Sequence, residues 1–241
     1  MARARMTRSE LKAQDEITST LERLTESAIA RKKEVLTALA VIVAVGALLY
    51  GWRTYAAGQN ASAQVQLRAV MVAFQAQDQS EQDRYEKTIV EAQKLVADYP
   101  SSAAAPVAQY YMALSQDGLG DMPNAVKNLE DVIGRGDSDI KPIAQFALAG
   151  VYKRNGELQK AIDVLKQLDA SGGYSRSAVS FELASLGEAA SQNDLAQNYY
   201  SKVITDFPDS PFRSEAEAAL KRMGLPIPNP APVEVPPAVT P

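Results

Sequence analysis

The sequence predicts an all-α protein, in which a single N-terminal transmembrane helix is followed by a helical solenoid of about four helix pairs and a capping helix. Three observations predict this fold class. Residues 35–52 form a run without charge, and apolar positions recur every 35 or 36 residues later in the chain. The phrases "DYPSS" at 98–102 and "DFPDS" at 206–210 lie 108 residues apart, which is three units of 36.

The first predicted element is the transmembrane helix "VLTALAVIVAVGALLYGW" at 35–52. Its 18 residues would rise about 27 Å as a helix, close to the roughly 30 Å of a bilayer core. Aromatic rings and basic groups at its ends suit the headgroup level. The predicted interface residues are Lys32, Lys33, Tyr50, Trp52 and Arg53.

We interpret this run as an uncleaved signal anchor, with a cleaved signal peptide as the alternative because "ASA" at 61–63 resembles a cleavage site. The run is longer than the usual apolar region of a signal peptide, and 34 residues precede it. Basic residues gather before the span, and only Arg53 follows it within residues 53–67. The positive-inside rule then predicts a cytoplasmic N-terminus and, in a bacterium, a periplasmic C-terminal part.

The region after the span predicts paired helices that repeat. Small residues recur on the first helix of each pair at Ala113, Ala149 and Ala184, and on the second helix at Ala125, Ala161 and Ala196. Larger apolar residues recur at Leu129, Leu165 and Tyr200, and a looser first copy offers Thr88, Ala92 and Leu95. Two helices in a period near 34 are the signature of tetratricopeptide repeats, so the expected solenoid is tetratricopeptide-like.

Turn residues set the predicted helix ends. A proline after an aromatic residue ends the second helix of the first and fourth repeats, since proline lacks an N–H and disfavours helix at the preceding residue. The second and third repeats end instead at glycines, in "GRGDSD" and "SGG". A polar capping helix is expected over 210–224, with Asp209 or Ser210 as its N-cap and Pro211 in its first turn.

Composition excludes several classes of function. The chain contains no cysteine and no histidine, which removes disulfides, Cys or His nucleophiles and bases, and nearly all zinc or haem sites. Residues 35–241 carry 17 Lys/Arg against 23 Asp/Glu, an acidic balance that argues against nucleic-acid binding. We read "RGD" at 135–137 and "DSD" at 137–139 as turn chemistry. We therefore expect no catalytic residue, no metal or cofactor site and no small-molecule substrate.

An aromatic column is the candidate functional site. Tyr110, Phe146 and Phe181 occupy the same early position on three successive first helices, and Phe74 falls close to it in the loose first copy. First helices line the concave face of such solenoids, so this column could receive an apolar peptide or helix. The alternative is that the rings only pack between neighbouring helices.

The stretch "RKKEVLTALAVIVAVGALLYGWRTY", followed by repeats, resembles the bacterial ancillary subunit of the SecYEG translocon, the YfgM-like family. The resemblance covers roughly residues 30–225 and implies a bitopic protein that works beside the translocon and periplasmic chaperones. The "DYPSS" and "DFPDS" phrases are similar to those of envelope-assembly repeat proteins. The expected function is therefore a non-enzymatic protein–protein interaction adaptor, and the alternative is a structural scaffold in a larger envelope or respiratory complex.

The predicted protein has four parts and is anchored in the bacterial inner membrane, with its repeat domain in the periplasm. Residues 1–34 form a cytoplasmic leader, 35–52 the membrane anchor, 53–224 a periplasmic repeat domain, and 225–241 a disordered proline-rich tail. Within the leader, Ile17, Leu21, Leu24 and Ala28 have helical spacing, and Ser19 and Glu22 form a possible capping box. The partners expected are proteins and the lipid bilayer.

Overall fold

The computed structural model describes residues 32–229, and this part of the chain contains helices and no strand. The predicted leader helix around 17–28 and the tail from 230 onwards lie outside the described residues. The chain divides into two compact units, 1–58 and 59–241. The all-α prediction is confirmed for the described part.

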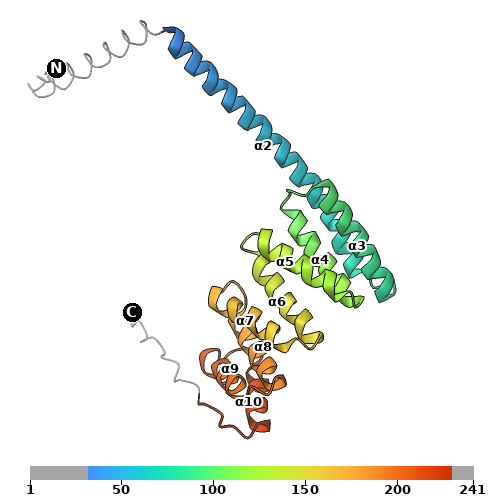
Figure 1. The fold of residues 1–241 in the computed structure, drawn as a ribbon, viewed down its shortest axis with the longest axis vertical. Helices are drawn as coiled ribbons and strands as arrows, with labels where there is room; N and C mark the ends of the chain where they lie inside the picture. Colours follow the sequence, from blue (N-terminus) through green and yellow to red (C-terminus); the bar gives the residue numbers. More distant parts are fainter. Residues whose placement is uncertain (1–31, 230–241) are drawn as a thin grey trace, which may run out of the picture. The chain divides into compact units, whose positions relative to one another are not determined.

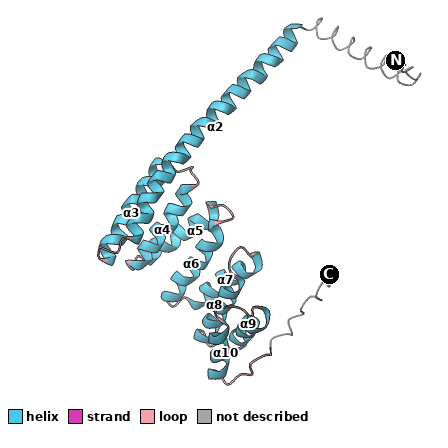
Figure 2. Ribbon diagram, turned by 180° about the vertical axis from the view of Figure 1, so that it is seen from behind, coloured by secondary structure: helices cyan, strands magenta, loops and turns pink. Residues whose placement is uncertain are grey.

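Nine helices make up this part, as Figure 1 shows by label and Figure 2 from behind. Their bounds are α2 Lys32–Gln75, α3 Glu81–Asp98, α4 Ala104–Gly118, α5 Met122–Arg135, α6 Ile140–Arg154, α7 Leu158–Ser171, α8 Arg176–Ala189, α9 Asn193–Asp206 and α10 Arg213–Arg222.

The first unit contains the N-terminal part of α2. Large apolar side chains here are exposed on all sides of the helix, among them Leu39, Ile42 and Leu49. By length and composition alone, the stretch Leu39–Gln75 could cross a membrane. Helix α2 continues without a break beyond Trp52, where the apolar run of the sequence ends.

The second unit is a series of antiparallel helix pairs. Residues 59–75 of α2 pair with α3, α4 pairs with α5, α6 with α7 and α8 with α9, and α10 packs on α9. The first helices of neighbouring pairs also touch, as α4 and α6 do. This is the predicted tetratricopeptide-like solenoid with a capping helix (Figure 1).

Burial confirms the predicted repeat register. The small residues of the first helices, Ala113, Ala149 and Ala184, are all buried, and so are those of the second helices, Ala125, Ala161 and Ala196. A side chain no larger than a methyl group at these crossings lets the paired helices approach closely. The core divides into three clusters along the series, each shared by neighbouring pairs.

The repeated aromatic-proline phrases end helices as predicted. Tyr99 follows α3 with φ −134° and ψ 55°, and Phe207 follows α9 with φ −130° and ψ 60°. In each case the serine three residues later donates its backbone N–H to the aromatic residue's carbonyl, at 3.1 Å for Ser102 and 2.9 Å for Ser210. The same phrase therefore builds the same turn in the first and fourth pairs.

Helix α10 begins at Arg213, three residues later than the predicted start at Ser210. The chain turns first, because the Ser210 hydroxyl accepts the backbone N–H of Phe212 at 3.2 Å. Ser210 thus shapes the turn before the helix, and Phe212 occupies the N-cap position without a side-chain cap. At the other end, Gly224 has φ 70° and follows the helix as a stop.

Candidate protein-binding site

The predicted aromatic column lies on the first helices in a shared register. Tyr110 on α4, Phe146 on α6 and Phe181 on α8 each stand three residues before the buried alanine of their own helix. All three side chains are half-buried. Each ring packs partly on the core and leaves its remaining surface to solvent.

Phe146 is joined by an aromatic residue from outside the repeat pattern. The rings of Phe146 and Tyr174 stack with centroids 4.6 Å apart and planes 19° apart. Tyr174 lies in the turn between α7 and α8, so a turn residue of one repeat covers the first helix of its own pair. Such a stacked pair stabilises its own geometry by about 0.5–1.5 kcal/mol beyond the area it buries.

Two glycines place Tyr174 on this face. Gly172 and Gly173 have φ of 73° and 86°, in the left-handed region that side chains other than glycine rarely adopt. A Cβ atom at Gly173 would lie 2.9 Å from Cγ of Pro142, in the first turn of α6. The turn after α7 therefore packs directly against the start of α6 and brings Tyr174 over Phe146.

Tyr110 packs against the same core cluster as Phe146 and Tyr174. Burial raises the pKa of the Tyr110 hydroxyl, and electrostatic interaction with Tyr174 and Tyr111 raises it further. The rings of Tyr174 and Phe146 stack on each other, and Tyr110 of the preceding repeat packs against the same core cluster. We name Tyr110, Phe146 and Tyr174 the central aromatic cluster.

Phe181 and Phe74 lie in separate groups. Phe181 stacks on Phe212, just before α10, with centroids 5.1 Å apart, so the chain's own C-terminal segment covers one face of its ring. Phe74, near the end of α2, contacts Tyr111 at 5.1 Å and Tyr85 of α3 at 6.2 Å. Tyr111 also contacts Tyr110, with centroids 5.6 Å apart, so Phe74 and Tyr110 are linked through Tyr111. Phe146 and Phe181 instead each stack on a ring from outside the column.

Ion pairs connect successive first helices and hold their spacing. Lys153 of α6 binds Glu182 of α8 with Nζ and Oε1 2.8 Å apart, and Arg154 of α6 pairs with Asp117 of α4. These side chains are partly exposed, so each pair contributes no more than about 1 kcal/mol. Their role is to fix which turns of neighbouring first helices stand opposite one another.

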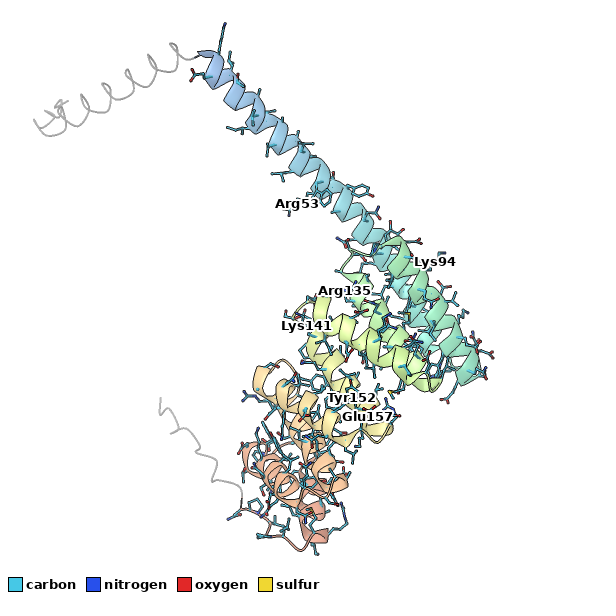
Figure 3. All side chains as sticks on the ribbon, viewed as in Figure 1. Arg53, Lys94, Arg135, Lys141, Tyr152 and Glu157 are labelled. Carbon is cyan, nitrogen blue, oxygen red and sulfur yellow. The ribbon has the colours of Figure 1, made fainter. Side chains whose placement is uncertain are left out.

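Two basic residues lie near the central aromatic cluster in the sequence. Lys141 precedes Pro142 in the first turn of α6 (Figure 3), and Arg176 begins α8 two residues after Tyr174. Among residues 32–229, no ion pair or hydrogen bond occupies either side chain. Two unpaired basic side chains therefore stand at the starts of α6 and α8.

This arrangement suits recognition of a protein segment. Half-exposed rings can contact apolar or aromatic side chains, and the two free cations can contact acidic ones. Within the described residues no group of three acidic side chains could hold a metal ion. Reasoning from the sequence missed Tyr174 and Phe212, because neither occupies a repeating position. The only signal for Tyr174 was its place directly after a Gly-Gly helix stop.

Comparison with known proteins agrees with this architecture. The family model described as tetratricopeptide repeat-like domain matches residues 31–179. A crystal structure of the nearly identical TPR-like repeats of a putative kinesin light chain from Podosopora anserina is 20% identical, with a TM-score of 0.50, and the match covers 69% of this chain and 86% of that one. A single-substitution form of the same protein is 19% identical with a TM-score of 0.43, over 70% and 92% of the two chains. No curated protein sequence matches this chain.

Proposed function

The chain belongs to the tetratricopeptide repeat-like domain family, and on that premise we propose that it is a membrane-anchored, non-enzymatic adaptor that binds other proteins. Domains of this family mediate protein–protein interactions and typically act as scaffolds without catalysis. Helix solenoids suit this role because their stacked pairs present an extended surface.

One observation carries the proposal: Tyr110 and Phe146 on the first helices and Tyr174 in the turn after α7 are all half-buried, and unpaired Lys141 and Arg176 lie near them in the sequence. If the rings only packed internally, the chain would not need two glycines with positive φ to bring Tyr174 from the turn onto α6. A partner segment with an apolar or aromatic anchor and nearby acidic residues fits this surface. Contact with Lys141 and Arg176 would then fix its direction.

The proposed placement follows the charge distribution of the sequence. Residues 1–34 are cytoplasmic, 35–52 span the bacterial inner membrane, 53–224 form the periplasmic domain, and 225–241 form the tail. Protease added to intact spheroplasts should digest the repeat domain. Survival of this domain until lysis would contradict the orientation.

The proposed partners are SecYEG translocon subunits, periplasmic chaperones or other envelope proteins. The resemblance of residues 30–225 to the ancillary translocon subunits supports the first two. In this role the anchor keeps the repeats at the membrane surface, where an emerging client or a chaperone can be held. A structural role in a larger envelope or respiratory complex is the alternative that the experiment below separates.

A photo-crosslinking amino acid placed at Tyr174 in the full chain tests the adaptor function. We expect crosslinks to translocon or chaperone subunits from this position, and none from a matched position at Lys166, which is exposed on the second helix α7. Equal crosslinking from both positions would contradict the site. Stoichiometric co-purification with one unrelated complex would favour the scaffold role.

A pair of substitutions in the same register isolates the contribution of the ring. Phe146→Leu removes a ring of the central aromatic cluster and should weaken capture of the crosslinked partner about ten-fold. Phe181→Leu changes the equivalent residue, which stacks on Phe212 outside the central aromatic cluster, and should leave capture nearly unchanged. Similar losses in both variants would mean that the rings only stabilise the fold.

A further inference from the structure

The first helix pair leaves one side of the second unit uncovered. On α2, Val65, Ala69, Val72 and Ala76 follow helical spacing of four, three and four residues, which places them along one side of the helix and the turn after it. Val65 and Val72 are 75% and 63% exposed. We name these four residues the entry face, since a preceding repeat would pack there.

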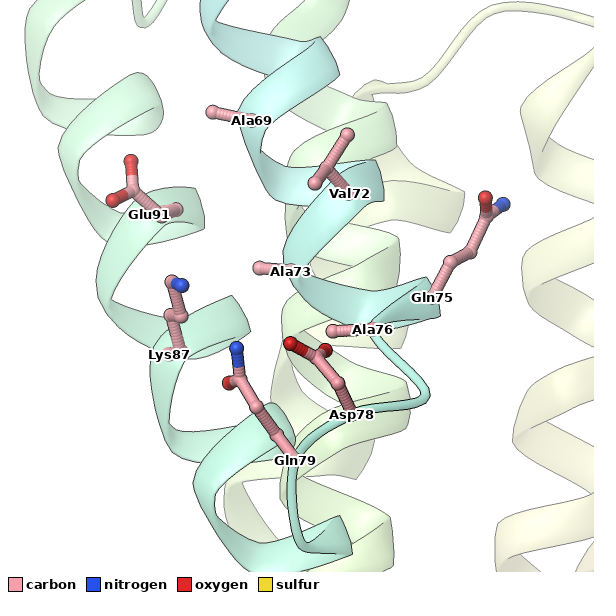
Figure 4. Close-up of a pocket in the computed structure, with 9 residues that line it drawn as sticks. All are labelled: Ala69, Val72, Ala73, Gln75, Ala76, Asp78, Gln79, Lys87 and Glu91. Carbon is pink, nitrogen blue, oxygen red and sulfur yellow. The ribbon is translucent and has the colours of Figure 1, made fainter.

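A hollow of about 510 Å³ lies beside the entry face, between α2 and α3 (Figure 4). Its apolar lining comes from α2 and the turn after it, and its polar rim comes from the end of α2, that turn and α3. The apolar residues are Ala69, Val72, Ala73 and Ala76, and the polar ones are Gln75, Asp78, Gln79, Lys87 and Glu91.

The opposite end of the series is already closed. Helix α10 buries Ala216, Ala219 and Leu220 against the last pair and presents charged residues such as Glu215 and Lys221 outward. Among the described residues, Ile227 is the one large apolar side chain exposed after α9, so this end offers a second copy little apolar surface to stack on. Head-to-tail association, which would give open filaments, is disfavoured, whereas entry face against entry face gives a closed two-fold contact.

The charges around the hollow are self-complementary. Lys87 and Glu91 lie one helical turn apart on α3, and Asp78 lies in the loop between α2 and α3. One small surface therefore carries both positive and negative charge. None of the ion pairs or hydrogen bonds among residues 32–229 includes these three side chains. A strongly acidic or basic partner would leave one sign facing its like, whereas in a two-fold contact Lys87 of each copy can face an acidic side chain of the other.

We propose that two copies of this chain associate through their entry faces, with Val65 and Val72 at the centre of the contact. Lys87, Glu91 and Asp78 form its polar rim. Burial of the exposed valines drives the association, and the mixed charges of the rim select a second copy over a partner of a single sign. The central aromatic cluster takes no part in this contact, so the inference stands independently of the proposed function.

Disulfide crosslinking in native membranes tests the contact on the full chain. Because the sequence has no cysteine, Val72→Cys introduces one reactive thiol. We expect a product of twice the monomer mass under mild oxidation, and no such product from Asn198→Cys, which is equally accessible on α9. Only monomer from Val72→Cys, or an adduct with a different protein, would overturn the proposal.

The mass of the detergent-solubilised chain provides a second test. The unaltered chain should sediment at twice the protein mass of Val72→Asp, while Ile227→Asp, another exposed apolar position, should keep the larger mass. Lys87→Glu makes the rim wholly acidic and should give monomer, and adding Glu91→Lys should restore the dimer. A monomeric unaltered chain at micromolar concentration, or a dimer unaffected by both Val72→Asp and Lys87→Glu, would refute the contact.

Discussion

Replacing Gly187 with alanine tests how closely α8 and α9 approach each other. A Cβ atom at Gly187 would lie 2.9 Å from the backbone nitrogen of Ala196 and 3.2 Å from its Cα, and 3.3 Å from the carbonyl oxygen of Gln192. All three neighbours are backbone atoms, so no side chain can rotate away and the two helices must separate. The expected overpacking cost is about 1–3 kcal/mol.

Gly150 in α6 is the matched control for this substitution. A Cβ atom there meets only the flexible guanidinium of Arg154, at 3.5 Å and 3.8 Å. Both changes gain the higher helix propensity of alanine, worth up to about 1 kcal/mol. We therefore expect Gly150→Ala to stabilise the protein slightly and Gly187→Ala to destabilise it, with the two variants differing by about 1–3 kcal/mol.

Urea unfolding of the full chain in detergent, followed by circular dichroism, measures this difference from the midpoints at a common m-value. In a repeat domain of this size, 1 kcal/mol corresponds to a melting shift of roughly 2–4 °C. Equal stability of the two variants, or a more stable Gly187→Ala, would refute the argument that backbone contact limits the space at this crossing.

Two further predictions concern the cap and the turn that carries the aromatic ring. Tyr200→Phe removes the 2.9 Å hydrogen bond from the tyrosine hydroxyl to Glu188, and should cost about 1–2 kcal/mol in urea unfolding; no loss would mean that water replaces the bond. Burial raises the pKa of the Glu188 carboxyl, but hydrogen bonds from Arg222 and Tyr200 outweigh it and hold the pKa below the ordinary value of 4.5. The stability from this carboxylate is therefore present above pH 4.5 and is lost as the pH falls through the lower folded-state pKa. Arg222→Ala should flatten this loss in an acid titration followed by circular dichroism, and an unchanged acid midpoint would contradict the assignment. Gly173→Ala combines a left-handed φ of 86° with contact to Pro142, and should lower the melting temperature and displace the following aromatic ring. Unchanged fluorescence of the tyrosines and unchanged melting would contradict the role of this turn.

Residue spacing predicted which rings of the first helices share a register, but it did not predict which other rings contact them. The interval of 36 and 35 residues placed Tyr110, Phe146 and Phe181 in one register, and the structure confirms that register. It could not show that Phe212 stacks on Phe181, or that Phe74 contacts Tyr85 and reaches Tyr110 only through Tyr111. These contacts depend on where turns and the cap return to the surface.

The sequence by itself determined the helix pairs, their order and their ends. A period near 36 requires two helices per unit, and small residues such as Ala149 and Ala161 must stand where those helices cross. Aromatic-proline and glycine stops end the helices through local backbone geometry, which nearby residues alone decide.

Only the tertiary structure decided which surfaces are covered and which remain open. It placed Tyr174 over Phe146, brought the backbone of α9 against Gly187, and left Val72 exposed at the first pair. The physical reason is that each depends on contacts between segments outside the repeating register. The sequence does not show whether a neighbouring helix packs on a valine at a helix surface or leaves it exposed.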